Sequence, residues 1–299
     1  MSPTAVIELS CQTFRCDIAP DIGGCVAGLW LDAIPVLRVP ATPALSSARQ
    51  AGCFPLLPFS NRVGHASLLW NGSRYPLQTT VGDEPHAIHG VGWQRPWRVL
   101  EASAQHARLA YEHLPDESWP FAFAAVQTFR LSAHALDLSL SLCNRSAHIV
   151  PAGLGWHPYF VKRQRSHLSF DASGRWEMGA DKLPTHRAAS PGLDTDCAAL
   201  EVDHCYDGWP GVVHLRDEQL HTRVTSSLDR LVVFTNDSRH FVAMEPVSHV
   251  NNAFHLMGAP GASAAGLGVR QLQAGESTHA TMRIHVARST ALVPTTPVD

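Results

Sequence analysis

Apolar and polar residues alternate with a period of two in many short segments of this 299-residue chain. Residues 136–142, Leu-Asp-Leu-Ser-Leu-Ser-Leu, place leucines on one face and polar groups on the other, as a half-buried β-strand requires. Turn residues separate the runs at intervals too short for helices of about 10 residues to intervene regularly. The pattern therefore predicts a mostly β protein, with further strands at 5–9, 98–101, 123–131, 222–225, 230–235 and 281–287.

A hairpin is predicted at 68–75, because the Asn-Gly pair at 71–72 accepts the positive φ angles of a type I′ turn. The chain has no internal repeat and no long linker, so we expect a single domain over residues 1–288. The fold class is all-β, a large antiparallel β-sandwich with few short helices. The polar stretch 171–203 is expected to form a long loop, and residues 289–299 a loose C-terminal tail.

Composition excludes several classes of partner. The formal charge of -3 and the 16% of charged residues give no concentrated basic surface for nucleic acid or an anionic membrane. The N-terminus lacks the basic and apolar regions of a signal peptide, and no apolar run reaches about 18 residues, which predicts a cytoplasmic protein. Seven cysteines without a C-x-x-C pair indicate reduced, mostly buried thiols and neither a disulfide framework nor a zinc site.

Motifs for phosphate cradles and for a serine nucleophile are missing from the sequence. No G-x-x-x-x-G-K-[ST] occurs, and none of the three G-x-G pairs is followed by the third glycine of a dinucleotide-binding loop. No G-x-S-x-G elbow occurs either. The sequence therefore predicts neither a nucleotide cofactor nor a serine hydrolase.

Five segments rich in polar residues carry candidate chemistry. In one of them, His157 lies among aromatic residues, where an imidazole that changes protonation near neutral pH would sit beside flat apolar faces suited to a sugar ring. The segments are 58–64 (PFSNRVG), 86–93 (HAIHGVGW), 153–160 (GLGWHPYF), 202–209 (VDHCYDGW) and 244–254, which begins MEP and ends NNAF.

In order and content these segments resemble the aldose 1-epimerases, also called galactose mutarotases, over nearly the whole chain. The matching motifs are Asn61-Arg62, His89-Gly90, His157 to Phe160, Asp203 to Tyr206, and Glu245. A last matching motif, Leu-x-x-Gly-Glu at 272–276, precedes the final predicted strand.

The resemblance implies a large β-sandwich that holds a small-molecule sugar in a cleft on one sheet, without metal or cofactor, as a monomer or homodimer. It implies that Glu245 is the base for the C1 hydroxyl and that His157 is the acid for the ring oxygen. One acid and one base suffice to open and reclose a sugar ring, and each can supply about 10²- to 10⁴-fold in rate. The remaining implied roles are assistance by His89 and hydroxyl binding by Arg62, Asn61 and Asp203. Aromatic faces at Trp93, Trp156, Tyr159 or Phe160 could stack on the apolar side of a pyranose, and of these we select Trp93 and Trp156.

The sequence leaves several alternatives open. His86 competes with His89, and Asp207 competes with Asp203, for the position that faces the sugar. Arg62 either binds sugar or bridges a structural carboxylate. The basic run 162–165 is either a solvated loop or a site for a sugar phosphate at the rim of the cleft.

Rival functions are a non-catalytic carbohydrate-binding or regulatory protein on the same fold, a hexose-phosphate mutarotase, and a histidine-metal enzyme built on His86-x-x-His89. A glycoside hydrolase would need a second carboxylate beside Glu245. Pro158 after His157 and Val91 after Gly90 depart from the best-known galactose mutarotases. These departures place the chain with a bacterial branch of related epimerases whose sugars are varied, so galactose specificity does not carry over.

Overall fold

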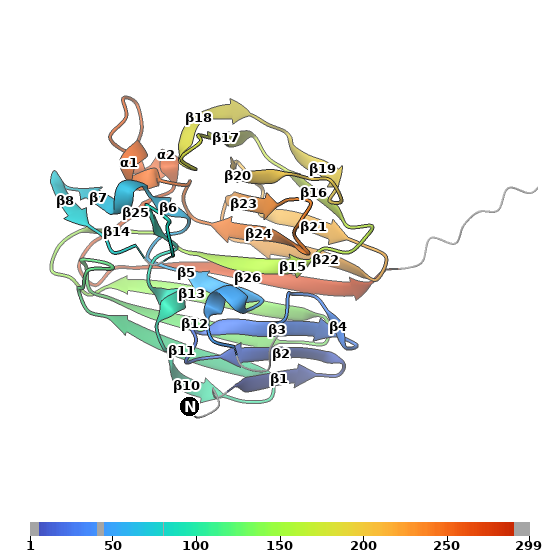
Figure 1. The fold of residues 1–299 in the computed structure, drawn as a ribbon. Coiled ribbons are helices and arrows are strands. Elements are labelled where there is room, and N and C mark those ends of the chain that lie inside the picture. The colour runs from blue at the N-terminus through green and yellow to red at the C-terminus, as the bar shows by residue number, and fades with distance from the viewer. Residues whose placement is uncertain (1–5, 41–44, 80, 290–299) are drawn as a thin grey trace, which may run out of the picture.

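Two large antiparallel sheets form most of the molecule in the computed structural model, which describes residues 6–40, 45–79 and 81–289 (Figure 1). Within these residues the first sheet has 11 strands, in the order β1 (Ile7–Cys11), β2 (Phe14–Ala19), β3 (Cys25–Leu31), β5 (Cys53–Leu56), β15 (Gly155–Val161), β24 (Phe241–Val247), β23 (Arg230–Thr235), β20 (Val202–Asp207), β17 (Gly174–Met178) and β18 (Pro184–Ala189), with β4 (Ile34–Pro35) beside β3. The second sheet has nine, in the order β10 (Arg98–Ala102), β11 (His106–His113), β12 (Phe123–Leu131), β13 (Ala135–Asn144), β26 (Ser277–Arg288), β22 (Leu220–Ser226), β21 (Val212–Arg216), β16 (His167–Asp171) and β19 (Gly192–Asp196).

Smaller elements gather at one end of the sandwich (Figure 1). They are the pairs β6 (Arg62–Val63) with β9 (Ala87–Ile88), β7 (Ser67–Trp70) with β8 (Ser73–Pro76) and β14 (Val150–Ala152) with β25 (Arg270–Leu272), and the helices α1 (Ala253–Leu256) and α2 (Ala264–Leu267). Short 3-10 helices occur at Ala48–Gln50 (η1), Gly64–Ala66 (η2) and Gly92–Gln94 (η3). The predicted all-β sandwich with few short helices is confirmed.

The segments with period-two alternation form strands because the sheets bury the apolar face of each segment. The four leucines of β13 are all buried, while the intervening Asp137, Ser139 and Ser141 are half-exposed. Strand β13 pairs with β12 on one side and β26 on the other, so the second sheet presents a continuous apolar face to the first. Each of the other predicted runs coincides wholly or largely with a strand.

The prediction of a long loop at 171–203 is wrong, because β17, β18 and β19 occupy much of it. Strands β17 and β18 end the first sheet, and β19 ends the second. Edge strands bury little of either face, so their residues are mostly polar and show no hydrophobic alternation. Their backbone hydrogen bonds hold them in place without an apolar face.

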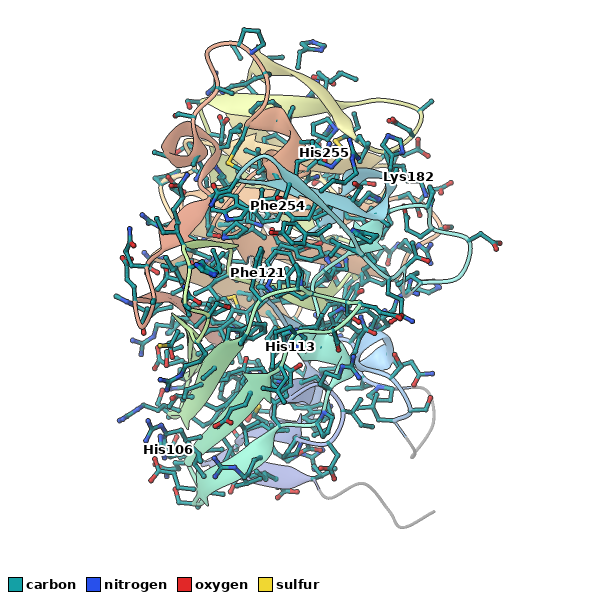
Figure 2. The ribbon with its side chains drawn as sticks, turned by 90° about the vertical axis from the view of Figure 1, so that its left-hand side faces the viewer. His106, His113, Phe121, Lys182, Phe254 and His255 are labelled. Carbon is teal, nitrogen blue, oxygen red and sulfur yellow. The ribbon has the colours of Figure 1, made fainter. Side chains whose placement is uncertain are left out.

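The hairpin prediction is confirmed, with φ angles of 48° at Asn71 and 76° at Gly72 between β7 and β8. Beside the hairpin lies an aromatic cluster, on the side of the molecule that Figure 2 views. In it Trp119 packs against Phe121 at 5.7 Å, Phe254 at 6.1 Å and Phe59 at 5.6 Å, measured between ring centroids. This packing fixes the segment around Phe59, which leads directly to Asn61-Arg62.

The helices of the described segments are too short, or not apolar enough, to span a membrane. All seven cysteines are free thiols and five of them are buried, as predicted. Ser289 is hydrogen-bonded to the carbonyls of Gln219 and Asp217, while the rest of the predicted tail, residues 290–299, lies outside the described residues. The single domain over 1–288 stays a prediction.

Candidate active site

The first sheet brings His157 and Glu245 together through the register of two neighbouring strands. Strands β15 and β24 pair antiparallel, with Tyr159 opposite Ala243. Two residues before Tyr159 on β15, His157 therefore lies opposite Glu245. Facing residues of an antiparallel pair project from the same side of the sheet, so the imidazole and the carboxyl group meet.

These two side chains lie at the bottom of a cavity of about 330 Å³ on the first sheet. Their exposed fractions are 8% for His157 and 3% for Glu245. Loops from both halves of the chain complete the wall. The lining residues are Arg38, Arg49, Phe54, Asn61, Arg62, Val81, Ile88, His89, His157, Tyr159, Lys182, Asp203, Phe234, Arg239, Phe241 and Glu245.

His157 and Glu245 form a direct contact that leaves one polar atom of each side chain free. The distance from Nε2 of His157 to Oε1 of Glu245 is 3.1 Å. Nδ1 of His157 and Oε2 of Glu245 are buried without a hydrogen-bond partner. Buried polar atoms are nearly always paired, so an unpaired atom on each of two residues that line one cavity indicates a place for a polar ligand.

Burial shifts the two pKa values in opposite directions. It raises the pKa of Glu245 well above 4.5, and the charge of Asp203 raises it further. It lowers the pKa of His157 well below 6.5, to which His89 and Arg38 contribute. Both shifts favour the uncharged forms, a protonated Glu245 and a neutral His157, so the pair holds one proton that either member can carry, which lets it act as an acid and a base in turn.

The two opposite pKa shifts lead to a prediction about how the free energy of unfolding depends on pH. The raised pKa of Glu245 costs stability as the pH rises from 4.5, and the lowered pKa of His157 costs stability as the pH falls from 6.5. Between pH 4.5 and pH 6.5 the two effects on the free energy of unfolding cancel in the wild type. The Glu245→Gln variant keeps only the effect of His157. From pH 4.5 upward, we expect the advantage of wild type over Glu245→Gln in urea unfolding to fall by up to about 1.4 kcal/mol per pH unit. A difference that does not change with pH would contradict the raised pKa of Glu245.

His89 is the histidine of its segment that reaches the cavity. Its ring lies 5.1 Å from that of His157, edge to face, and its Nδ1 is buried without a partner. Burial lowers the pKa of His89 to about 3, so the ring is neutral. His86 instead connects two loops, because one ring nitrogen contacts the backbone nitrogen of His65 and the other the carbonyl of Asp181, each at 2.9 Å. In the described part of the chain no group of three or more His, Cys, Asp or Glu side chains could hold a metal ion.

Asn61 and Arg62 both line the cavity, at the start of β6. The guanidinium of Arg62 is fixed by Glu84, with Nε to Oε1 at 3.2 Å and Nη2 to Oε2 at 3.1 Å. Burial acts to raise the pKa of Glu84, but the hydrogen bonds from Arg62 and neighbouring positive charges lower it overall. Arg62 thus bridges a carboxylate and faces the cavity at once. No sequence motif marks Glu84, which we did not predict.

Asp203 lines the cavity and Asp207 does not. The register of β20 with β23, and of β23 with β24, puts Asp203 in the same row across the sheet as Phe234 and Ala243. Asp207 is held by Arg187 and by the indole nitrogen of Trp176, at 2.8 Å and 2.9 Å. It therefore links β17 to β18, the edge strand of the first sheet.

The structure contradicts the placement of Trp93 and Trp156 on the sugar. Trp156 precedes His157 on β15 and so points to the opposite face, where it is fully buried and its indole donates to Oε1 of Gln127 at 3.2 Å. Trp93 is buried behind Phe54, with ring centroids 5.6 Å apart, and its indole donates to the carbonyl of Gly90. The aromatic residues that do line the cavity are Phe54, Tyr159, Phe234 and Phe241.

The basic run at 162–165 does not reach the cavity. Arg163 forms an ion pair with Asp217 at 2.8 Å, and Lys162 donates to the carbonyl of Asn236 at 2.6 Å. Besides Arg62, four further cations line the cavity, and no sequence motif marks them. They are Arg38, Arg49, Arg239 and Lys182, the last of which is labelled in Figure 2.

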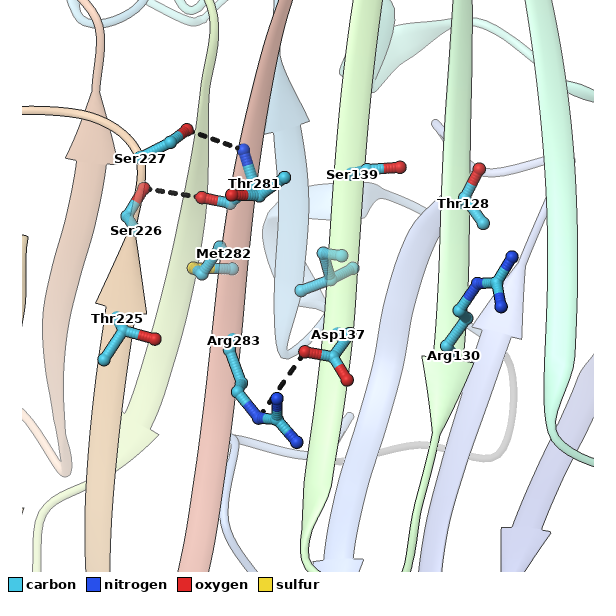
Figure 3. Close-up of a pocket in the computed structure, with 11 residues that line it drawn as sticks. Thr128, Arg130, Asp137, Ser139, Thr225, Ser226, Ser227, Thr281, Met282 and Arg283 are labelled. Atoms are coloured by element: carbon cyan, nitrogen blue, oxygen red, sulfur yellow. Dashed lines mark hydrogen bonds and ion pairs between the residues drawn. The ribbon is translucent and has the colours of Figure 1, made fainter.

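A larger hollow of about 510 Å³ lies on the outer face of the second sheet (Figure 3). Its one carboxylate, Asp137, already pairs with Arg283 at 3.5 Å, and Ser226 donates to the carbonyl of Thr281 at 2.7 Å. It holds no buried acid and base in contact. The cavity around His157 and Glu245 is therefore the candidate active site.

Comparison with known proteins agrees with this architecture. A family model described as aldose 1-epimerase matches residues 6–285. The uncharacterized protein YphB of Escherichia coli (strain K12) is 30% identical over an alignment of 269 residues that covers 84% of this chain and 90% of YphB. A crystal structure of an Escherichia coli K12 protein assigned provisionally as an aldose 1-epimerase superposes with a TM-score of 0.85 at 28% identity, covering 95% of this chain and 99% of that one.

More distant structures show the same fold. A galactose mutarotase-like protein from Clostridium acetobutylicum has a TM-score of 0.83 at 15% identity, covering 94% of this chain and 95% of that chain. The family match spans nearly all of the sequence, including every strand that lines the cavity. The chain belongs to the aldose 1-epimerase family.

Proposed function

We propose that this protein is an aldose 1-epimerase that interconverts the α and β anomers of a sugar. The observation that carries the proposal is the contact of 3.1 Å between His157 and Glu245, buried in a cavity with one free polar atom on each side chain. An acid and a base that share one proton are what the opening of a cyclic hemiacetal requires.

In the free protein burial favours the proton of the pair on Glu245, and in the proposed reaction this proton moves across the 3.1 Å contact to His157 when the sugar binds. Glu245 takes the proton of the C1 hydroxyl while the bond between C1 and the ring oxygen breaks, and His157 gives its proton to that oxygen. The open-chain aldehyde rotates about the bond between C1 and C2. Reclosure returns one proton to His157 and one to O1, so no atom is gained or lost.

The rest of the lining orients the sugar. Neutral His89 hydrogen-bonds near the ring oxygen, and Asn61, Arg62 and Asp203 bind ring hydroxyl groups. Phe54 and Tyr159 pack against the His157 ring and hold it in place, and the half-buried Phe234 contributes apolar surface to the pyranose. Because burial excludes water from the pair, its charges act at short range with little screening.

Polarimetry on freshly dissolved anomers of several aldoses tests the proposal. Purified protein is expected to accelerate the approach to the equilibrium rotation for at least one sugar. If no aldose responds while calorimetry detects sugar binding, the protein is a carbohydrate-binding module on this fold and the proposal fails.

Glu84→Gln provides a separate prediction about Arg62. The amide cannot form the charged two-point contact, so Arg62 loses its fixed orientation, and we expect KM to rise about tenfold with kcat little changed. The matched control is Glu112→Gln, an exposed glutamate outside the cavity. A loss confined to kcat would contradict a role in positioning Arg62.

A further inference from the structure

We propose that the natural substrate is an aldose with an anionic group on C6, a phosphate, sulfonate or carboxylate, bound by Arg38, Arg49 and Arg239. The inference rests on the proposed epimerase function and names its substrate class. Its basis is a cluster of guanidinium groups on one wall of the cavity.

Aromatic rings hold two of these arginines in place. The Cζ atom of Arg38 lies 3.7 Å from the ring centroid of Tyr159 and 5.2 Å from that of Phe241. The Cζ atom of Arg239 lies 5.8 Å from the Phe241 ring, and Arg49, from η1, lines the same cavity. Stacked guanidinium groups keep their N–H donors free at the edges, where they match the oxygens of phosphate or carboxylate.

These charges are not neutralised by the protein. Across the described segments, none of the three arginines has a carboxylate oxygen within 4.0 Å. Nη2 of Arg38 donates to the carbonyl of Arg49 and to that of Ala51, the latter at 2.9 Å, but Nε of Arg38 is buried without a partner. Burial lowers the pKa of Arg38 overall, although Tyr159 acts to raise it, and the charges of Arg49 and Arg239 also lower it. Gathering like charges around a buried donor is unfavourable until an anion joins them.

The cluster lies on the side of the site that C6 would occupy. Tyr159, beneath Arg38, has its ring 4.3 Å from that of His157. The charges that act on the pKa of His157 include Arg38 and Arg49, whereas those that act on Glu245 are Asp203 and Arg62. His157 serves the ring oxygen in the proposed reaction, and that oxygen is bonded to C5, which carries C6. An anionic group on C6 therefore points toward the arginines, and the hydroxyl groups toward Asp203 and Arg62.

The kinetic test compares glucose and galactose with a hexose 6-phosphate, a 6-deoxy-6-sulfohexose and a hexuronate at low ionic strength. At least one anionic sugar is expected to exceed its neutral parent in kcat/KM by about tenfold or more. Comparison of the phosphate, the sulfonate and the carboxylate identifies which anion the site prefers. Because Arg49 and Arg239 are exposed, this advantage should shrink once salt exceeds about 0.1 M. Equal or higher kcat/KM for the neutral sugars than for all three anionic ones overturns the inference.

Substitutions tie the preference to the cluster. Arg239→Gln and Arg49→Gln are each expected to lower the ratio of kcat/KM for the anionic over the neutral sugar by about tenfold. Arg239→Lys should lower it less, because it keeps the charge and loses only the fork geometry. Arg98→Gln removes the same charge from an exposed strand outside the cavity and should leave the ratio unchanged. An unchanged ratio in Arg239→Gln rejects the proposal.

Calorimetry separates this inference from the proposed function. If no sugar undergoes faster mutarotation, the acid–base proposal fails, while titration of the wild type and of Arg239→Gln with the hexose 6-phosphate still tests the anion site. Tighter binding of the phosphate than of the neutral hexose, weakened in the variant, supports the site. Equal binding of the two sugars rejects it. Mutarotation of neutral sugars alone rejects the inference and keeps the epimerase.

Discussion

Replacing Glu245 with glutamine, or His157 with asparagine, is expected to slow mutarotation by about 10²- to 10⁴-fold. Glutamine cannot accept the proton of the C1 hydroxyl, and asparagine cannot deliver one to the ring oxygen. Both substitutes keep a polar group of similar size in the buried site, so the fold should persist. Polarimetric rates give the size of the loss, and circular dichroism verifies that the sheets are intact.

Two exposed residues outside the cavity provide the matched controls for these variants. Glu112→Gln and His279→Asn make the same chemical changes, and both should keep the wild-type rate. The double variant of Glu245 and His157 should lose little more than the worse single variant, since the two groups act as a unit. Near-wild-type activity in either single variant would show that the acid and the base lie elsewhere.

Trp156→Ala is expected to lower the free energy of unfolding by about 3 to 5 kcal/mol. The indole is fully buried between the sheets and donates a hydrogen bond to Gln127, so its removal leaves both a large void and an unpaired amide oxygen. Urea unfolding measures the change. Trp30→Ala, at a partly exposed indole beside Arg15, should cost much less.

The same experiment distinguishes a structural Trp156 from a sugar-stacking one. A residue that stacks on the substrate would raise KM on substitution and leave stability nearly intact. Loss of stability with unchanged KM in the surviving folded protein fits the position of Trp156 behind the sheet. A wild-type unfolding midpoint together with a raised KM would contradict that position.

Much of the candidate site was visible in the sequence as order and content of motifs. Glu245, His157, His89, Asn61, Arg62 and Asp203 were all named from the sequence, and all line one cavity. The tryptophans were misplaced because an aromatic residue beside a catalytic histidine looks relevant in one dimension. Adjacent residues of a strand face opposite sides of the sheet, so Trp156 is the neighbour of His157 that cannot share its cavity.

The sequence by itself determined the strands that have an alternating apolar face, and the chemical candidates, because alternation and short motifs are properties of neighbouring residues. Only the tertiary structure decided between His86 and His89, and between Asp203 and Asp207. Those choices depend on which side chain reaches the cavity and which is taken up by a distant partner. The guanidinium cluster was also decided only by the tertiary structure, since Arg38, Arg49 and Arg239 come from segments that carry no motif. Strand pairing between residues far apart in the chain sets the faces that meet, and no local pattern encodes it.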